Sequence, residues 1–93
     1  MTYLVIWIPE ALQELAAIWL VASDRNAVTT ATHEIDLVLE LFPNSAGKTV
    51  FATVREYARS PLVVEFEVDD VNRRVYVISV WGIAHGRPPL TGN

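Results

Sequence analysis

Residues 55–81, REYARSPLVVEFEVDDVNRRVYVISVW, decide the fold, because they contain two apolar strands and the turn that joins them. Apolar residues alternate with other residues over 62–68, which is the two-residue period of a strand with one face on a core. The acidic and amide residues of 69–72 then interrupt the pattern, as in a hairpin turn. Residues 75–81 are apolar on both rows, which indicates a strand in the middle of a sheet.

The alternation over 62–68 assigns its side chains to two faces of the sheet. The row expected to face the core consists of Leu62, Val64, Phe66 and Val68. The row expected to face water consists of Val63, Glu65 and Glu67. We also expect Arg55 and Thr53 on this second face, beside the two glutamates.

Before this hairpin, one strand and two helices are predicted. Residues 3–8, YLVIWI, form a short, aromatic and β-branched run that predicts a strand. Pro9 suits the first turn of a helix, and strong helix formers continue to residue 22. Leu12, Leu15, Trp19 and Ala22 share one stripe of this helix, and its second half is apolar nearly all round.

A second helix follows the cap residues of 23–26. Its apolar residues repeat at spacings of three and four, and they are Val28, Ala31, Ile35, Val38, Leu39 and Phe42. Residues 43–47, PNSAG, end this helix in a loop, and the β-rich residues 49–57 predict a further strand. Glycine and proline are frequent after Trp81, which predicts a flexible tail over residues 83–93.

These elements predict a two-layer α+β fold of order β-α-α-β-β-β, an antiparallel sheet with a helical hairpin on one face. A strand that is apolar on both rows needs two neighbours, so we expect residues 3–8 beside residues 75–81. The predicted strand order is first, last, third, second. One domain covers residues 1–82, since 93 residues suffice for one domain and not for two.

Composition limits the class of function. The chain contains no cysteine, which excludes disulfides, thiolate catalysis and zinc–cysteine sites. Eleven acidic and seven basic residues give a net charge of −4, whereas proteins that bind phosphate backbones usually carry a basic excess. No signal sequence fits, and no apolar run approaches the roughly 20 residues that span a membrane. We expect a cytoplasmic protein without a cofactor or a metal site.

The chain resembles the RelE/ParE superfamily, the toxin half of type II toxin–antitoxin modules. The resemblance covers nearly the whole chain and rests on three features: Trp-Ile-Pro-Glu-Ala-Leu at 7–12, the helical hairpin, and the two strands of 60–69 and 74–81. It implies a cytoplasmic toxin that inhibits growth, stabilises plasmids and is neutralised by a cognate antitoxin. It also implies ribosome-bound mRNA or DNA gyrase as the target, and it leaves a homodimer open.

Family members that cleave mRNA carry lysines and arginines on the exposed sheet face, where the cations stabilise charge on the phosphate. By this resemblance, the corresponding positions fall near Phe51 and Thr53, at Val63, and near Ile83, and none of these residues is basic. Arg55 is the one cation at a corresponding place. The usual ribonuclease constellation is therefore expected to be lacking.

Candidate site residues follow from these two lines of reasoning. If the chain cleaves RNA with an altered arrangement of catalytic residues, the residues assigned to catalysis are Arg55, Lys48, His85 and Arg87. The residues assigned to antitoxin or target binding are Trp19, Arg55, Arg59, Glu65 and Glu67. The alternative for Arg55 is an ion pair with Glu65 or Glu67, and the alternative for Arg59 and Lys48 is simple solvation.

Three functions remain open from the sequence. The first is a toxin that acts through a protein target and is bound by an antitoxin. The second is a ribosome-dependent mRNA endoribonuclease. The third is a non-toxic protein-interaction domain on the same scaffold, since a fold does not determine a function.

Overall fold

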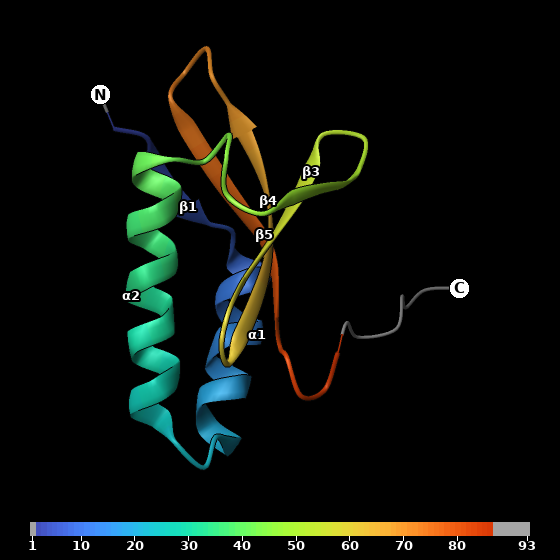
Figure 1. Ribbon diagram of the computed structural model, residues 1–93. Helices are drawn as coiled ribbons and strands as arrows, with labels where there is room; N and C mark the ends of the chain where they lie inside the picture. The colour runs from blue at the N-terminus through green and yellow to red at the C-terminus, as the bar shows by residue number, and fades with distance from the viewer. Residues whose placement is uncertain (1, 87–93) are drawn as a thin grey trace.

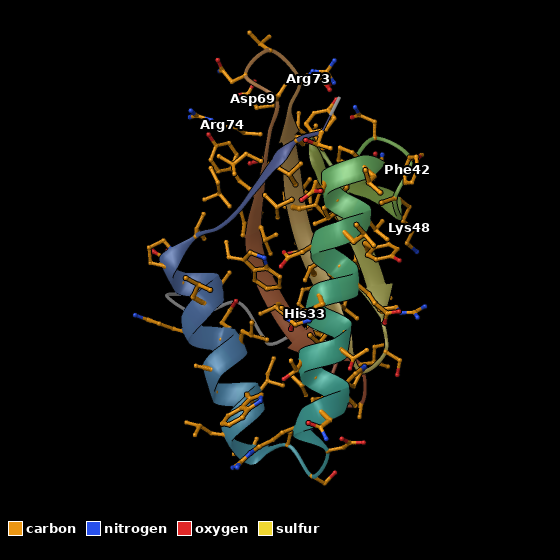
Figure 2. The ribbon with its side chains drawn as sticks, turned by 90° about the vertical axis from the view of Figure 1, so that its left-hand side faces the viewer. His33, Phe42, Lys48, Asp69, Arg73 and Arg74 are labelled. Carbon is orange, nitrogen blue, oxygen red and sulfur yellow. The ribbon has the colours of Figure 1, made fainter. Side chains whose placement is uncertain are left out.

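A computed structural model describes residues 2–86 as seven elements packed in two layers (Figure 1). In chain order they are β1 (Leu4–Trp7), α1 (Pro9–Val21), α2 (Arg25–Leu41), β2 (Lys48–Phe51), β3 (Val54–Arg59), β4 (Leu62–Asp69) and β5 (Arg74–Gly82). The five strands form one sheet in the order β1-β5-β4-β3-β2. Both helices lie in front of this sheet in Figure 2, so the predicted two-layer α+β fold is confirmed.

The predicted position of the first strand beside the last is confirmed, because residues 4–7 of β1 pair with residues 74–77 of β5. This pair is parallel, whereas the other neighbours in the sheet are antiparallel. The expectation of a wholly antiparallel sheet is thus corrected to a mixed sheet. A parallel pair requires a long crossover connection, and the helical hairpin that follows β1 begins one.

The prediction of a single strand over residues 49–57 was wrong. The chain turns at Ala52 and Thr53, and β2 pairs with β3 as a hairpin that projects from the edge of the sheet (Figure 1). Ala52 has a φ of +47°, which a residue other than glycine adopts mainly in tight turns. The sequence signal was missed because Ala-Thr is not a typical turn pair.

The core lies between the helices and the inner sheet face. The row that begins at Leu62 faces it as predicted, and Phe66 is among its largest fully buried side chains. Of the residues predicted to face inward from the second helix, four are buried and Val38 is partly buried, whereas Phe42, just after the end of α2, is exposed (Figure 2).

The inward stripe of α1 differs from the predicted one. Ala11 is fully buried, and Leu15, Ile18 and Ala22 pack against the core, whereas Leu12 and Trp19 are exposed. Both stripes have helical spacing, but the small Ala11 side chain allows α1 to approach β5 closely.

The end of the described chain continues β5 into a turn. The amide of Ile83 donates to the carbonyl of Pro61, and the amide of His85 donates to the carbonyl of Gly82. Residues 87–93 of the predicted tail lie outside the described residues, so the domain boundary at residue 82 stays a prediction. No helix within residues 2–86 is both long enough and apolar enough to cross a membrane.

Candidate functional site

One sheet face is turned away from both helices, and we call it the open face. Strand register places Glu56 beside Glu65, Glu65 beside Ser79, and Glu67 beside Tyr76. Three neighbouring glutamates from two strands therefore share this face. Glu56 and Glu67 are partly exposed there, and their carboxylates repel phosphate groups rather than holding them.

The two glutamates of β4 differ in environment. Glu67 is partly exposed and accepts a hydrogen bond from the hydroxyl of Thr53, as expected for two residues on one face. Glu65 was expected to face water, but its exposed fraction is only 4%. It is buried because both neighbouring strands place side chains beside it, Glu56 from β3 and Ser79 from β5.

The placement of Arg55 on the open face was wrong. Arg55 is in register with Phe66, so its side chain leaves the sheet on the helix side. Its guanidinium donates to the carbonyl oxygens of Ala46 at 2.9 Å and Gly47 at 3.3 Å. The alternative of an ion pair with Glu65 or Glu67 is also corrected, because Arg55 instead ties β3 to the loop after α2.

Arg59 joins the sheet to the helical layer, so the alternative of a merely solvated cation is corrected. Its Nε donates to Glu34 Oε1 at 2.8 Å, and its Nη2 lies 2.6 Å from Glu34 Oε2. The hydrogen bond and charge of Arg59 lower the pKa of Glu34 below its ordinary value. This planar, two-point pairing is the geometry that arginine favours with a carboxylate.

The residues assigned to catalysis do not converge on one face. Lys48 lies in register with Glu56 on the edge hairpin, whereas Arg55 is on the helix side. His85 lines a separate pocket of about 350 Å³ where the α1–α2 corner meets the β3–β4 turn. Arg87 lies outside the described residues. Their catalytic role stays a prediction that the described geometry does not favour.

A second candidate surface is an apolar groove between the two helices, with a volume of about 450 Å³. Its α1 wall includes Leu12, Trp19 and Leu20, and its α2 wall includes Thr29 and His33. The exposed fraction of Trp19 is 40%. Exposed large apolar side chains gathered in one groove are typical of a protein interaction site.

Arg25 fixes the end of α1 that carries Trp19. Its guanidinium donates to the carbonyl oxygens of Trp19 at 3.0 Å and Leu20 at 2.9 Å, and it lies 4.5 Å from the Trp19 ring centre. The side chain of Arg25 therefore caps α1 and stacks on the indole.

Sequence reasoning identified the surplus apolar surface of α1 and Trp19 but missed the α2 wall of the groove. Thr29 and His33 carried no signal in the periodicity, because polar residues on an amphipathic helix are usually solvated. Within residues 2–86, no group of three or more His, Asp or Glu side chains is arranged to hold a metal ion.

No protein-family model and no curated protein matches the sequence. Solved structures do match the fold. The Mycobacterium tuberculosis toxin–antitoxin complex RelBE2 matches with a TM-score of 0.76 at 17% identity, over 90% of this chain and 94% of the matched chain. The Pseudomonas aeruginosa ParDE system matches with a TM-score of 0.67 at 19% identity, over 87% and 96%.

The free Escherichia coli toxin RelE, as a double arginine mutant, gives a TM-score of 0.67 at 18% identity, over 92% of this chain and 88% of the toxin. At these identities the likeness concerns the arrangement of helices and strands. The chain therefore has the fold of the RelE/ParE toxins.

Proposed function

We propose that this protein is the toxin component of a type II toxin–antitoxin module, that it acts in the cytoplasm, and that a cognate antitoxin neutralises it. Matches over most of both chains to structures of toxin–antitoxin complexes carry this proposal. The apolar groove between α1 and α2 supports it, since a toxin must offer a surface to its antitoxin.

We further propose that the toxin acts through a protein target and not by cutting RNA. Phosphoryl chemistry needs cations positioned around the reacting phosphate. The open face instead brings together Glu56, Glu65 and Glu67, and Arg55 is turned to the helix side. Lys48 is the one lysine of the chain, and it lies beside Glu56.

Induction of the gene alone tests the toxin assignment. We expect growth to stop while the protein accumulates, and growth to continue in cells that express an unrelated protein at the same level. Normal growth at a verified high level of this protein would contradict the proposal.

Primer extension on cellular mRNA separates the two modes of toxicity. A toxin with a protein target leaves no new 5′ ends in translated mRNA after induction. New cleavage ends that vanish in the Lys48→Gln variant would instead establish a ribonuclease with an altered layout.

A further inference from the structure

The tip of the β2–β3 hairpin exposes an aromatic side chain. Phe51 is the last residue of β2, and the chain turns directly after it at Ala52 and Thr53. We call these three exposed residues the hairpin tip. The exposed fraction of Phe51 is 53%, on a hairpin that projects from the edge of the sheet (Figure 1). An aromatic ring in such a place is suited to enter a pocket on a partner.

The edge strand β2 is protected against pairing with a further strand. Lys48 begins this strand, and its register with β3 shifts between Thr49 and Phe51, as at a β-bulge. Charged residues and bulges are the features by which sheet edges avoid the addition of strands. A partner at this edge therefore meets side chains, and Phe51 has the largest of them.

Two sets of hydrogen bonds tie the hairpin to the rest of the protein. Near its base, the Arg55 guanidinium donates to the Thr49 hydroxyl at 3.2 Å and to two carbonyl oxygens of the loop after α2. At the hairpin tip, the Thr53 hydroxyl donates to Glu67 on β4. Such ties reduce the conformational freedom that is lost when the hairpin enters a complex.

Strand register places Phe51 on the open face. Phe51 is opposite Val54, and residues opposite each other in a sheet point to the same side. Arg55, the next residue along β3, points to the helix side, so Val54 and Phe51 point to the other side. Phe51 therefore belongs to the surface that carries the glutamates.

One carboxylate gives the surroundings of Phe51 a negative charge. Glu67 accepts its hydrogen bond from Thr53, a neutral donor that does not cancel the charge of the carboxylate. Farther along the open face, the charge of Glu56 is partly offset by Lys48, which lies beside it in register. Glu67 is therefore the charge that a partner of the hairpin tip meets.

We propose that the hairpin tip binds the cellular target, and that the target is a protein with an apolar pocket bordered by lysine or arginine. Phe51 enters the pocket, and the bordering cation pairs with Glu67. This inference rests on the proposed function, because it names the surface and the partner chemistry of a toxin that acts on a protein. The groove between α1 and α2 stays available to the antitoxin.

Other occupants fit the hairpin tip less well. Two copies of this chain that meet through Phe51 bring their Glu67 carboxylates toward each other, which is unfavourable. A nucleic-acid base can stack on an aromatic ring, but Glu67 repels the phosphates on either side of that base. An added strand is disfavoured by the bulge in β2.

A matched pair of substitutions tests the proposal in cells that express the full-length protein. Phe51→Thr removes the ring and retains strand propensity. Phe42→Thr removes a ring of similar exposure, 61% against 53%, from the end of the helical layer. We expect Phe51→Thr to need at least about tenfold more protein to stop growth, and Phe42→Thr to match the wild type. Equal potency of the two variants would overturn the proposal.

Thermal unfolding of both purified variants separates a loss of binding from a loss of folding. We expect the two variants to unfold at nearly the same temperature. If Phe51→Thr fails to fold, Glu67→Gln takes its place, since it keeps an oxygen acceptor for Thr53 and removes the charge. Glu67→Gln should need about threefold more protein to stop growth, and unchanged potency would overturn the pairing with a cation.

Photocrosslinking identifies the class of partner and does not depend on growth arrest. Benzoylphenylalanine is incorporated at position 51 or, as the control, at position 42 of the full-length chain. We expect a nuclease-resistant adduct with another protein from position 51 only, reduced about threefold by Glu67→Gln. A nucleic-acid adduct, a dimer of this chain, no adduct, equal adducts from both positions, or an adduct that Glu67→Gln leaves unchanged would overturn the proposal.

The proposal and the toxin assignment fail in different ways. Normal growth on induction of the wild-type protein would reject the toxin assignment, and the adduct from position 51 would still decide whether the hairpin tip binds a protein. Growth arrest that Phe51→Thr leaves unchanged would reject the hairpin tip and leave the toxin assignment standing.

Discussion

The hydroxyl of Tyr3 donates a hydrogen bond to Oδ1 of Asp70, 67 positions away in the chain. Asn44 donates to the same oxygen at 2.9 Å, and the guanidinium of Arg73 lies 5.0 Å from the Tyr3 ring centre. The residue before β1, the loop after α2 and the β4–β5 turn thus meet at one carboxylate. This junction holds the end of the sheet to the end of the helical layer.

The junction predicts a pH-dependent contribution to stability. The hydrogen bonds from Tyr3 and Asn44 favour the carboxylate, so the pKa of Asp70 lies below its ordinary value. Its contribution is therefore present above the ordinary pKa of aspartate and is lost as the pH falls through the lowered pKa. We expect Tyr3→Phe to lower the midpoint of thermal unfolding at pH 7, and the loss to shrink in acid.

Tyr57→Phe is the control for this measurement. The Tyr57 ring packs against the core, and its hydroxyl makes no hydrogen bond to a carboxylate among the described residues. The effect of Tyr57→Phe on the midpoint should be the same at both pH values. A pH-independent loss in Tyr3→Phe would contradict the role of Asp70.

Two leucines of α2 test the orientation of the helical layer. Leu39 is fully buried, whereas Leu37 is exposed. Leu39→Ala should lower the free energy of unfolding by about 2–5 kcal/mol, because the substitution leaves a cavity in the core. Leu37→Ala should change it by about 0.5 kcal/mol or less. Equal losses in chemical denaturation would show that α2 is rotated about its axis.

The backbone at Gly47 leaves no room for a Cβ atom, so only glycine fits there without strain. Its φ is +61°, and an added Cβ would lie 1.8 Å from the carbonyl oxygen of Glu56 on β3. Gly86 also has a positive φ, +69°, but an added Cβ there meets open space. Gly86→Ala should therefore cost only the backbone strain of about 1–2 kcal/mol.

Gly47→Ala should cost clearly more than Gly86→Ala, because the β2–β3 hairpin must move as well. Urea denaturation of the two variants measures the difference. If both variants were equally stable, the close approach of Gly47 to β3 would be refuted.

The sequence was sufficient for the fold where periodicity was long and regular. The alternation over residues 62–68 predicted a strand and the spacing from Val28 to Leu39 predicted a helix, and the structure confirms both elements, although Val63 and Glu65 of the row expected to face water are buried. The sequence was insufficient where two sets of residues had equally good helical spacing. Trp19 and Ala11 both belong to helical stripes of α1, and only contact with β5 decides which of them is inside.

The candidate site was harder to predict, because it depends on strand register. The split at Ala52 reverses the chain within residues 49–57, and no residue pattern marked it. Arg55 was consequently expected on the open face. Its register opposite Phe66 places it on the sheet face that the helices cover. The α2 wall of the groove is likewise built from residues that are distant in sequence from Trp19.

Coexpression tests most directly whether the apolar groove between α1 and α2 receives the antitoxin while another surface causes toxicity. Leu37 is exposed on α2 four residues after His33 of the groove wall, and Val71, exposed at the β4–β5 turn, is the control position. Cells express the wild-type protein, Leu37→Glu or Val71→Glu, each with and without the product of the adjacent reading frame. We predict that all three arrest growth alone, and that the adjacent product rescues the wild type and Val71→Glu but not Leu37→Glu. Equal rescue of all three would contradict the account.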